Sequence, residues 1–100
     1  MEKTKFYKKT FNNIIKIFNV LREYEKEEKG FLTVSKISKI TGLHKWTVSR
    51  ILDLYLYPYV EIITPEHLDE VGLNLKLVRL KDPNLSLENL IKYLKLSRKI

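Results

Sequence analysis

The 100-residue chain is expected to form a single α+β domain, residues 1–100, in which helix predominates over strand. Apolar residues recur at helical spacing in four stretches, whereas only two segments have the β-branched, alternating character of strands. All three glycines and all three prolines lie at the boundaries between these segments. Because these residues agree with the periodicity, the sequence predicts a mostly α-helical α+β fold.

The first helix is expected over residues 10–29, with Gly30 at its end. Its apolar residues form two adjacent stripes, one of Phe11, Ile14, Ile15, Phe18 and Leu21 and one of Ile17, Val20 and Tyr24. Two stripes exceed what one small core needs, so this helix either lies deep in the domain or meets another subunit. The preceding residues 1–9 carry four lysines and one glutamate. They form either a basic arm that contacts phosphates or a solvated, frayed start of the helix.

Residues 33–56 are expected to form two short helices joined by a tight turn. The hydroxyl of Thr33 can cap the first helix, and Gly42 supplies the positive φ that ends it. The expected inward residues are Val34, Ile37, either Ile40 or Thr41, Leu43, Val48, Ile51, Leu52 and Tyr55. The expected outward residues are His44, Lys45, Trp46, Ser49, Arg50 and Asp53.

This stretch resembles the helix-turn-helix of DNA-binding transcription regulators. The resemblance rests on the turn at Gly42 and Leu43, the small Ser38 four residues before Gly42, and Val48 and Ile51 at fixed offsets after it. It implies that the second helix, residues 44–56, is a recognition helix that enters the major groove of double-stranded DNA. The alternative is two packed amphipathic helices without a ligand, because a fold does not dictate a function.

A β-hairpin is expected within residues 59–81. Pro58 should end the preceding helix near Leu56, because a proline disfavours helical backbone at the residue before it. Residues 60–64 and 73–80 then form two strands joined by a loop that begins with a proline and ends with a glycine.

A final helix is expected over residues 84–98, capped by Asn84 or Ser86. The order of these elements resembles the winged helix-turn-helix, in which the hairpin is called the wing, with an extra helix at each end of the chain. That resemblance also implies a short strand at Phe31 and Leu32 that joins the wing sheet.

Composition narrows the classes of function. The net charge of +7, from 19 basic and 12 acidic residues, favours a polyanionic partner such as nucleic acid. The chain has no cysteine, which excludes disulfides, zinc ribbons and thiol catalysis. The two histidines are isolated and no nucleophile or phosphate-binding glycine motif is present, so we expect no enzyme, metal or cofactor. No apolar run is long enough for a membrane span, and a cytoplasmic location is expected.

The winged-helix resemblance implies specific DNA contacts. The expected base-contacting residues are His44, Lys45, Trp46, Ser49 and Arg50, and the expected phosphate-contacting residues are Lys36, Lys39, Thr47, Lys76 and Arg79. Three of these residues have alternatives: Arg50 pairs with Asp53 or is simply solvated, Trp46 folds onto the apolar body, and His44 only caps its helix. The lysine-, isoleucine- and tyrosine-rich composition also resembles that of small DNA-binding proteins from thermophilic archaea or their viruses.

Regulators of this type usually act as dimers that match two half-sites. We therefore expect a homodimer through the first and last helices. The expected interface residues are Phe11, Ile14, Ile17, Tyr24, Tyr93 and Leu96.

The expected wing departs from the usual pattern, because residues 59–72 carry four carboxylates and no lysine or arginine. Such a loop repels phosphate. The alternative function is therefore a winged-helix protein-interaction module of a transcription or replication complex that uses the acidic wing.

Overall fold

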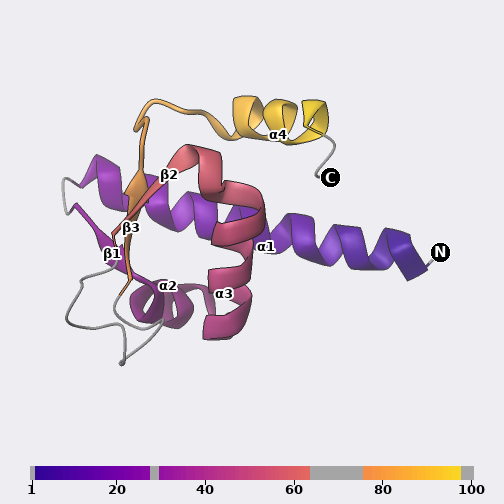
Figure 1. Ribbon diagram of the computed structural model, residues 1–100, viewed down its shortest axis with the longest axis horizontal. Coiled ribbons are helices and arrows are strands. Elements are labelled where there is room, and N and C mark those ends of the chain that lie inside the picture. The colour runs from indigo at the N-terminus through magenta and orange to yellow at the C-terminus, as the bar shows by residue number, and fades with distance from the viewer. Residues whose placement is uncertain (1, 28–29, 64–75, 98–100) are drawn as a thin grey trace.

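The computed structural model describes residues 2–27, 30–63 and 76–97 of the protein. Over these residues it has an α+β structure that is mostly helical, which confirms the predicted class (Figure 1). The helices are α1 (Glu2–Lys26), α2 (Val34–Thr41), α3 (Lys45–Ile51) and α4 (Leu87–Leu96), and the strands are β1 (Leu32–Thr33), β2 (Val60–Ile63) and β3 (Leu77–Leu80).

Helix α1 is longer at its N-terminus than the sequence predicts. It begins at Glu2 instead of near residue 10, and ends at Lys26. The additional residues include lysines and contain neither glycine nor proline, so a helix started at the core can propagate through them. The N-terminal part of α1 extends past α3 and α4 (Figure 1).

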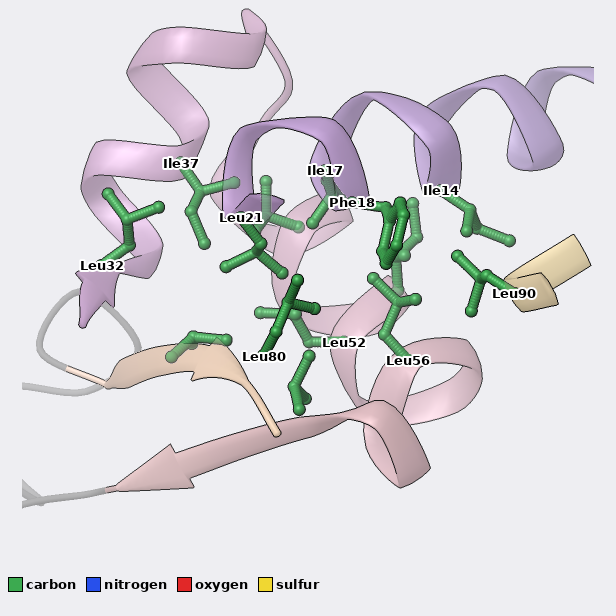
Figure 2. Close-up of a cluster of buried hydrophobic side chains, with 14 of the residues drawn as sticks. Ile14, Ile17, Phe18, Leu21, Leu32, Ile37, Leu52, Leu56, Leu80 and Leu90 are labelled. Atoms are coloured by element: carbon green, nitrogen blue, oxygen red, sulfur yellow. The ribbon is translucent and has the colours of Figure 1, made fainter. Parts of the chain in front are cut away.

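The middle of α1 is the centre of the core. Helix α1 packs against α2, α3, α4 and β3, and its residues Ile14, Ile17, Phe18 and Leu21 are at most 1% exposed. Figure 2 shows apolar side chains from the other elements converging on them. Of the two alternatives for the double stripe, the structure therefore supports a helix that lies deep in the domain.

The three strands that the structure describes form one antiparallel sheet in the order β1-β3-β2. Val78 of β3 pairs with Leu32 of β1 and with Ile62 of β2, so β3 is the central strand. The strand expected near Leu32 is thus confirmed, as are the described parts of the two hairpin strands. The expected loop and the adjoining strand residues, 64–75, lie outside the described residues.

Helical backbone covers the predicted range to Leu56 and then continues through Tyr59. A π-helical turn, η1 (Leu52–Leu56), follows α3 directly, and a 3₁₀ turn, η2 (Tyr57–Tyr59), follows η1. Tyr57, the residue before Pro58, is helical, with φ −47° and ψ −46°, so the expectation that Pro58 keeps helical backbone from this position is wrong. Pro58 lies in the first turn of η2, where its missing N–H leaves no helical hydrogen bond unmade.

Helix α4 is shorter than the predicted range of residues 84–98. Its cap is Ser86, whose hydroxyl accepts a hydrogen bond from the backbone N–H of Asn89 at 3.1 Å. Leu90 and Leu94 are buried against the core. Asn84 is therefore not the cap; its backbone N–H donates to the Asp82 carboxylate in the preceding turn.

Candidate nucleic-acid interface

Short polar side chains hold the turn between α2 and α3. Gly42 has φ 77°, and its N–H donates to the Ser38 carbonyl at 2.9 Å. The Thr41 hydroxyl donates to the Ile37 carbonyl at 2.7 Å and accepts from the Leu43 N–H at 3.2 Å. The Ser38 hydroxyl donates to the Leu43 carbonyl. These bonds leave little freedom in the angle between the two helices.

Side-chain caps start both helices. The Thr33 hydroxyl accepts from the Lys36 N–H at 3.0 Å, which confirms the predicted cap of α2. At α3, His44 Nδ1 accepts from the Trp46 N–H at 3.2 Å. The capping role considered for His44 is therefore observed, and only Nε2 of its exposed ring is left to contact a base.

The outward face of α3 combines an aromatic ring with a cation. Trp46 is 71% exposed, so it does not fold back onto the body of the domain. Arg50 and Asp53 are exposed beside it, yet among the described residues no ion pair joins them. Together with Thr47, Ser49 and Leu54, these residues line a shallow hollow of about 440 Å³. Such a surface can stack on or pack against a flat group and can bind an anion.

The structure corrects the orientation predicted for Ser49. Its side chain is only 6% exposed, because the buried arc of α3 and η1 extends from Ile51 through Leu52 to Leu56. Ser49 lies at the edge of this arc, and a hydroxymethyl group is too short to extend past its neighbours. Lys45 and Thr47 are half-buried at the two borders of the outward face.

The predicted phosphate-contacting residues fall into two groups. Lys36 and Lys39 are exposed on α2, Lys36 in its first turn and Lys39 in its last. Arg79 instead lies on the sheet, where its Nε is 3.1 Å from Glu61 Oε2 and its guanidinium is 4.8 Å from the centre of the Phe31 ring. This pairing reduces the positive charge that Arg79 presents. Lys76, which precedes the same strand, is half-buried.

A second groove, which we call the α1–α3 groove, was not predicted from the sequence. It has a volume of about 350 Å³ and is lined by Lys9, Thr10, Asn13, Thr47, Arg50, Ile51, Leu54 and Tyr55. Of its α1 residues, Lys9 belongs to the stretch expected to be a basic arm or a frayed helix start, whereas Thr10 and Asn13 lie in the first turns of the predicted helix. The one sequence signal that could have indicated them is the spacing of Lys9 and Asn13, which places both on one side of a helix.

The predicted dimer interface is partly wrong. Ile14 and Ile17 are buried in the chain's own core, so they cannot form an interface with a second chain. Tyr24 is half-buried against that core. On α4, Tyr93 and Leu96 are 44% and 72% exposed, and they remain available.

Phe11, the remaining predicted interface residue, is half-buried. The Tyr93 ring stacks on Tyr59, with centroids 6.2 Å apart and an interplanar angle of 12°. Burial, and then the neighbouring Tyr93, raises the pKa of the Tyr59 hydroxyl.

Over the described residues, no group of three or more histidine or carboxylate side chains is positioned to hold a metal ion. None of the helices described is long and apolar enough to cross a membrane. A scan against protein-family models finds no match for this chain, and no curated protein or solved structure is significantly similar to it.

Proposed function

We propose that the protein is a winged helix-turn-helix regulator of transcription that binds double-stranded DNA in a sequence-dependent way. The observation that carries the proposal is the outward face of α3, where Trp46 and Arg50 are exposed directly after a turn fixed by Gly42 and Ser38. A helix presented in this way fits the major groove of B-form DNA, which is wide enough for one helix.

Each exposed side chain has a role in the proposed complex. Arg50 binds guanine O6 and N7 with two of its guanidinium N–H groups. The Trp46 ring contacts a thymine methyl or a sugar. Lys36 and Lys39 bind phosphates and set the position of α3 without reading sequence. Residues 31–58 carry four cations and a single carboxylate, so the surface around the turn attracts the backbone.

The proposed regulator acts as a homodimer, because one short recognition helix contacts too few base pairs for strong binding. With Ile14 and Ile17 excluded, the proposed interface centres on Tyr93 and Leu96 of α4. Light scattering of the wild type and of Leu96→Lys tests this interface. A wild-type dimer that becomes monomeric in the variant supports it, and a wild-type monomer at working concentration contradicts it.

The decisive experiment is a binding selection on random DNA duplexes, followed by anisotropy titrations of the recovered sequence. Arg50→Ala should relax the preference at one base-pair position and weaken the recovered site by about 1–3 kcal/mol. Lys36→Ala should weaken all duplexes about equally. Recovery of no consensus, or an Arg50→Ala variant with unchanged sequence preference, contradicts sequence-dependent binding through α3.

A second candidate function is a protein-interaction module. The observation that favours it is a run of large, exposed apolar side chains along α3, η1 and η2, in which Trp46 is 71%, Leu54 47% and Tyr57 65% exposed. Exposed apolar surface of this kind is typical of protein interfaces. If Arg50→Ala and Lys36→Ala leave DNA affinity unchanged at moderate salt, this candidate is the better one.

A further inference from the structure

The α1–α3 groove differs in chemistry from the rest of the surface around α3. Its polar lining consists of two cations, Lys9 and Arg50, and four neutral side chains, Thr10, Asn13, Thr47 and Tyr55. None of the described residues that line it is acidic, although Asp53 lies in the adjacent hollow.

The neutral groups of the lining are held in place by the two helices. The apolar part of the lining consists of Ile51, Leu54 and the ring of Tyr55, of which Ile51 is only 3% exposed. Thr10 and Asn13 are half-buried on α1, one turn apart, so their positions follow that of the helix. Lys9 is exposed at the rim. The site therefore combines half-buried hydroxyl and amide groups with exposed positive charge.

This set of groups fits a phosphodiester. Such a group carries one negative charge and two unesterified oxygens, which accept hydrogen bonds from hydroxyls, amides and cations. We propose that the α1–α3 groove binds a backbone phosphate of the duplex whose major groove receives α3. This inference rests on the proposed function and adds Lys9, Thr10 and Asn13 to the DNA-contacting residues.

The position of Arg50 connects this site with base recognition. Arg50 lines both the outward hollow of α3 and the α1–α3 groove. A phosphate held by Lys9, Thr10 and Asn13 fixes the backbone beside Arg50 and so sets the depth at which α3 enters the groove. In the proposed complex, α1 is a lateral support for the recognition helix.

The test compares Lys9→Ala with two lysine variants of equal charge change. Lys8 is exposed next to Lys9 but does not line the groove, and Lys26 is exposed in the last turn of α1. Anisotropy titrations use the selected duplex and a scrambled duplex at several salt concentrations. Thr10→Val and Lys9→Arg are measured in parallel, and circular dichroism confirms that each variant is folded.

We expect Lys9→Ala to weaken both duplexes by about fivefold, as for the loss of one exposed ion pair. It should also reduce the slope of log affinity against log salt by about one. Thr10→Val should weaken both duplexes as well, whereas Lys9→Arg, Lys8→Ala and Lys26→Ala should have little effect. If Lys9→Ala, Lys8→Ala and Lys26→Ala all weaken binding equally, the groove site is overturned, but the proposed function is not. A wild type that binds no duplex overturns the proposed function as well.

Discussion

The two ends of α1 have opposite chemistry, although they belong to one continuous helix. In its first half, Lys9 and Asn13 line a groove with α3 that has no described acidic residues. Near its C-terminus, the groove that α1 forms with α2 has a volume of about 310 Å³ and an apolar lining of Val20, Tyr24 and Ile40. Glu23 and Glu27 also line this second groove.

The difference between these two parts of α1 predicts how a bound polyanion is oriented on the domain. A polyanion is attracted to the end of α1 beside α3 and repelled by the carboxylates at the end beside α2. In the proposed complex, the duplex therefore runs along α3 and the first half of α1, and away from Glu23 and Glu27. Three experiments test this distinction and a fourth tests another side of the domain, formed by η2 and α4; they are given from the largest expected effect to the smallest.

The largest effect should come from the buried residue that joins the two ends. Ile17 is fully buried in the middle of α1, so Ile17→Ala leaves a cavity and should lower the free energy of unfolding by about 2–5 kcal/mol. Chemical denaturation measures this change. Lys16→Ala, at an exposed neighbouring position, should change the stability by less than about 0.5 kcal/mol. Similar stabilities for both variants would mean that α1 is not the centre of the core.

Charge reversal tests the difference between the ends directly. Lys9→Glu should weaken DNA binding roughly tenfold, since it replaces an attraction with a repulsion at the α1–α3 groove. Glu23→Lys should leave affinity unchanged or slightly increase it, because this residue lies at the other end of the helix. Titrations at low and moderate salt separate the two variants. Equal and opposite effects of the two would show that only net charge matters.

The turn between α2 and α3 decides which helix each end of α1 faces. Gly42 has φ 77° and an open space where a Cβ would lie, so Gly42→Ala causes backbone strain without a clash. The expected loss of stability is about 1–2 kcal/mol. Gly30, with φ 79° and similarly open space, is the matched control. Both variants should lose similar stability in thermal unfolding, and only Gly42→Ala should also lose DNA affinity.

The smallest effect concerns Tyr59, on the side of the molecule formed by η2 and α4. Burial, and then Tyr93, raises the pKa of its hydroxyl above the ordinary value of 10.0. The unfolded chain therefore loses this proton at a lower pH than the folded one. The protonated Tyr59 hydroxyl therefore contributes fully to the free energy of unfolding below about pH 10. This contribution is lost as the pH rises through the pKa of Tyr59 in the folded protein.

Tyr59→Phe removes this titration. Because lysines titrate in the same range, the quantity to compare is the difference in unfolding free energy between wild type and variant at pH 9 to 11, a window set by the ordinary tyrosine pKa of about 10. The unfolding free energy of the wild type should fall relative to that of Tyr59→Phe as the pH rises. A constant difference would mean that the folded chain does not hold the Tyr59 proton.

Much of the local structure was predictable because it depends on groups a few residues apart. The caps formed by Thr33 and Ser86 each require one hydroxyl and an N–H three residues later. The end of α2 at Gly42 requires only a residue that tolerates a positive φ. The length of α1 was underestimated because helix propagation through residues 2–9 depends on a nucleus supplied by the core.

The sequence by itself thus determined the α+β class, the helix caps and the turn between α2 and α3. Only the tertiary structure decided which side chains of α3 stay exposed, because Ser49 and Arg50 are adjacent in sequence and differ in burial through packing alone. It also brought Lys9, Thr10 and Asn13 against Thr47 and Arg50. No local sequence pattern could predict that groove, because it lies between two helical segments whose residues are more than thirty positions apart in the sequence.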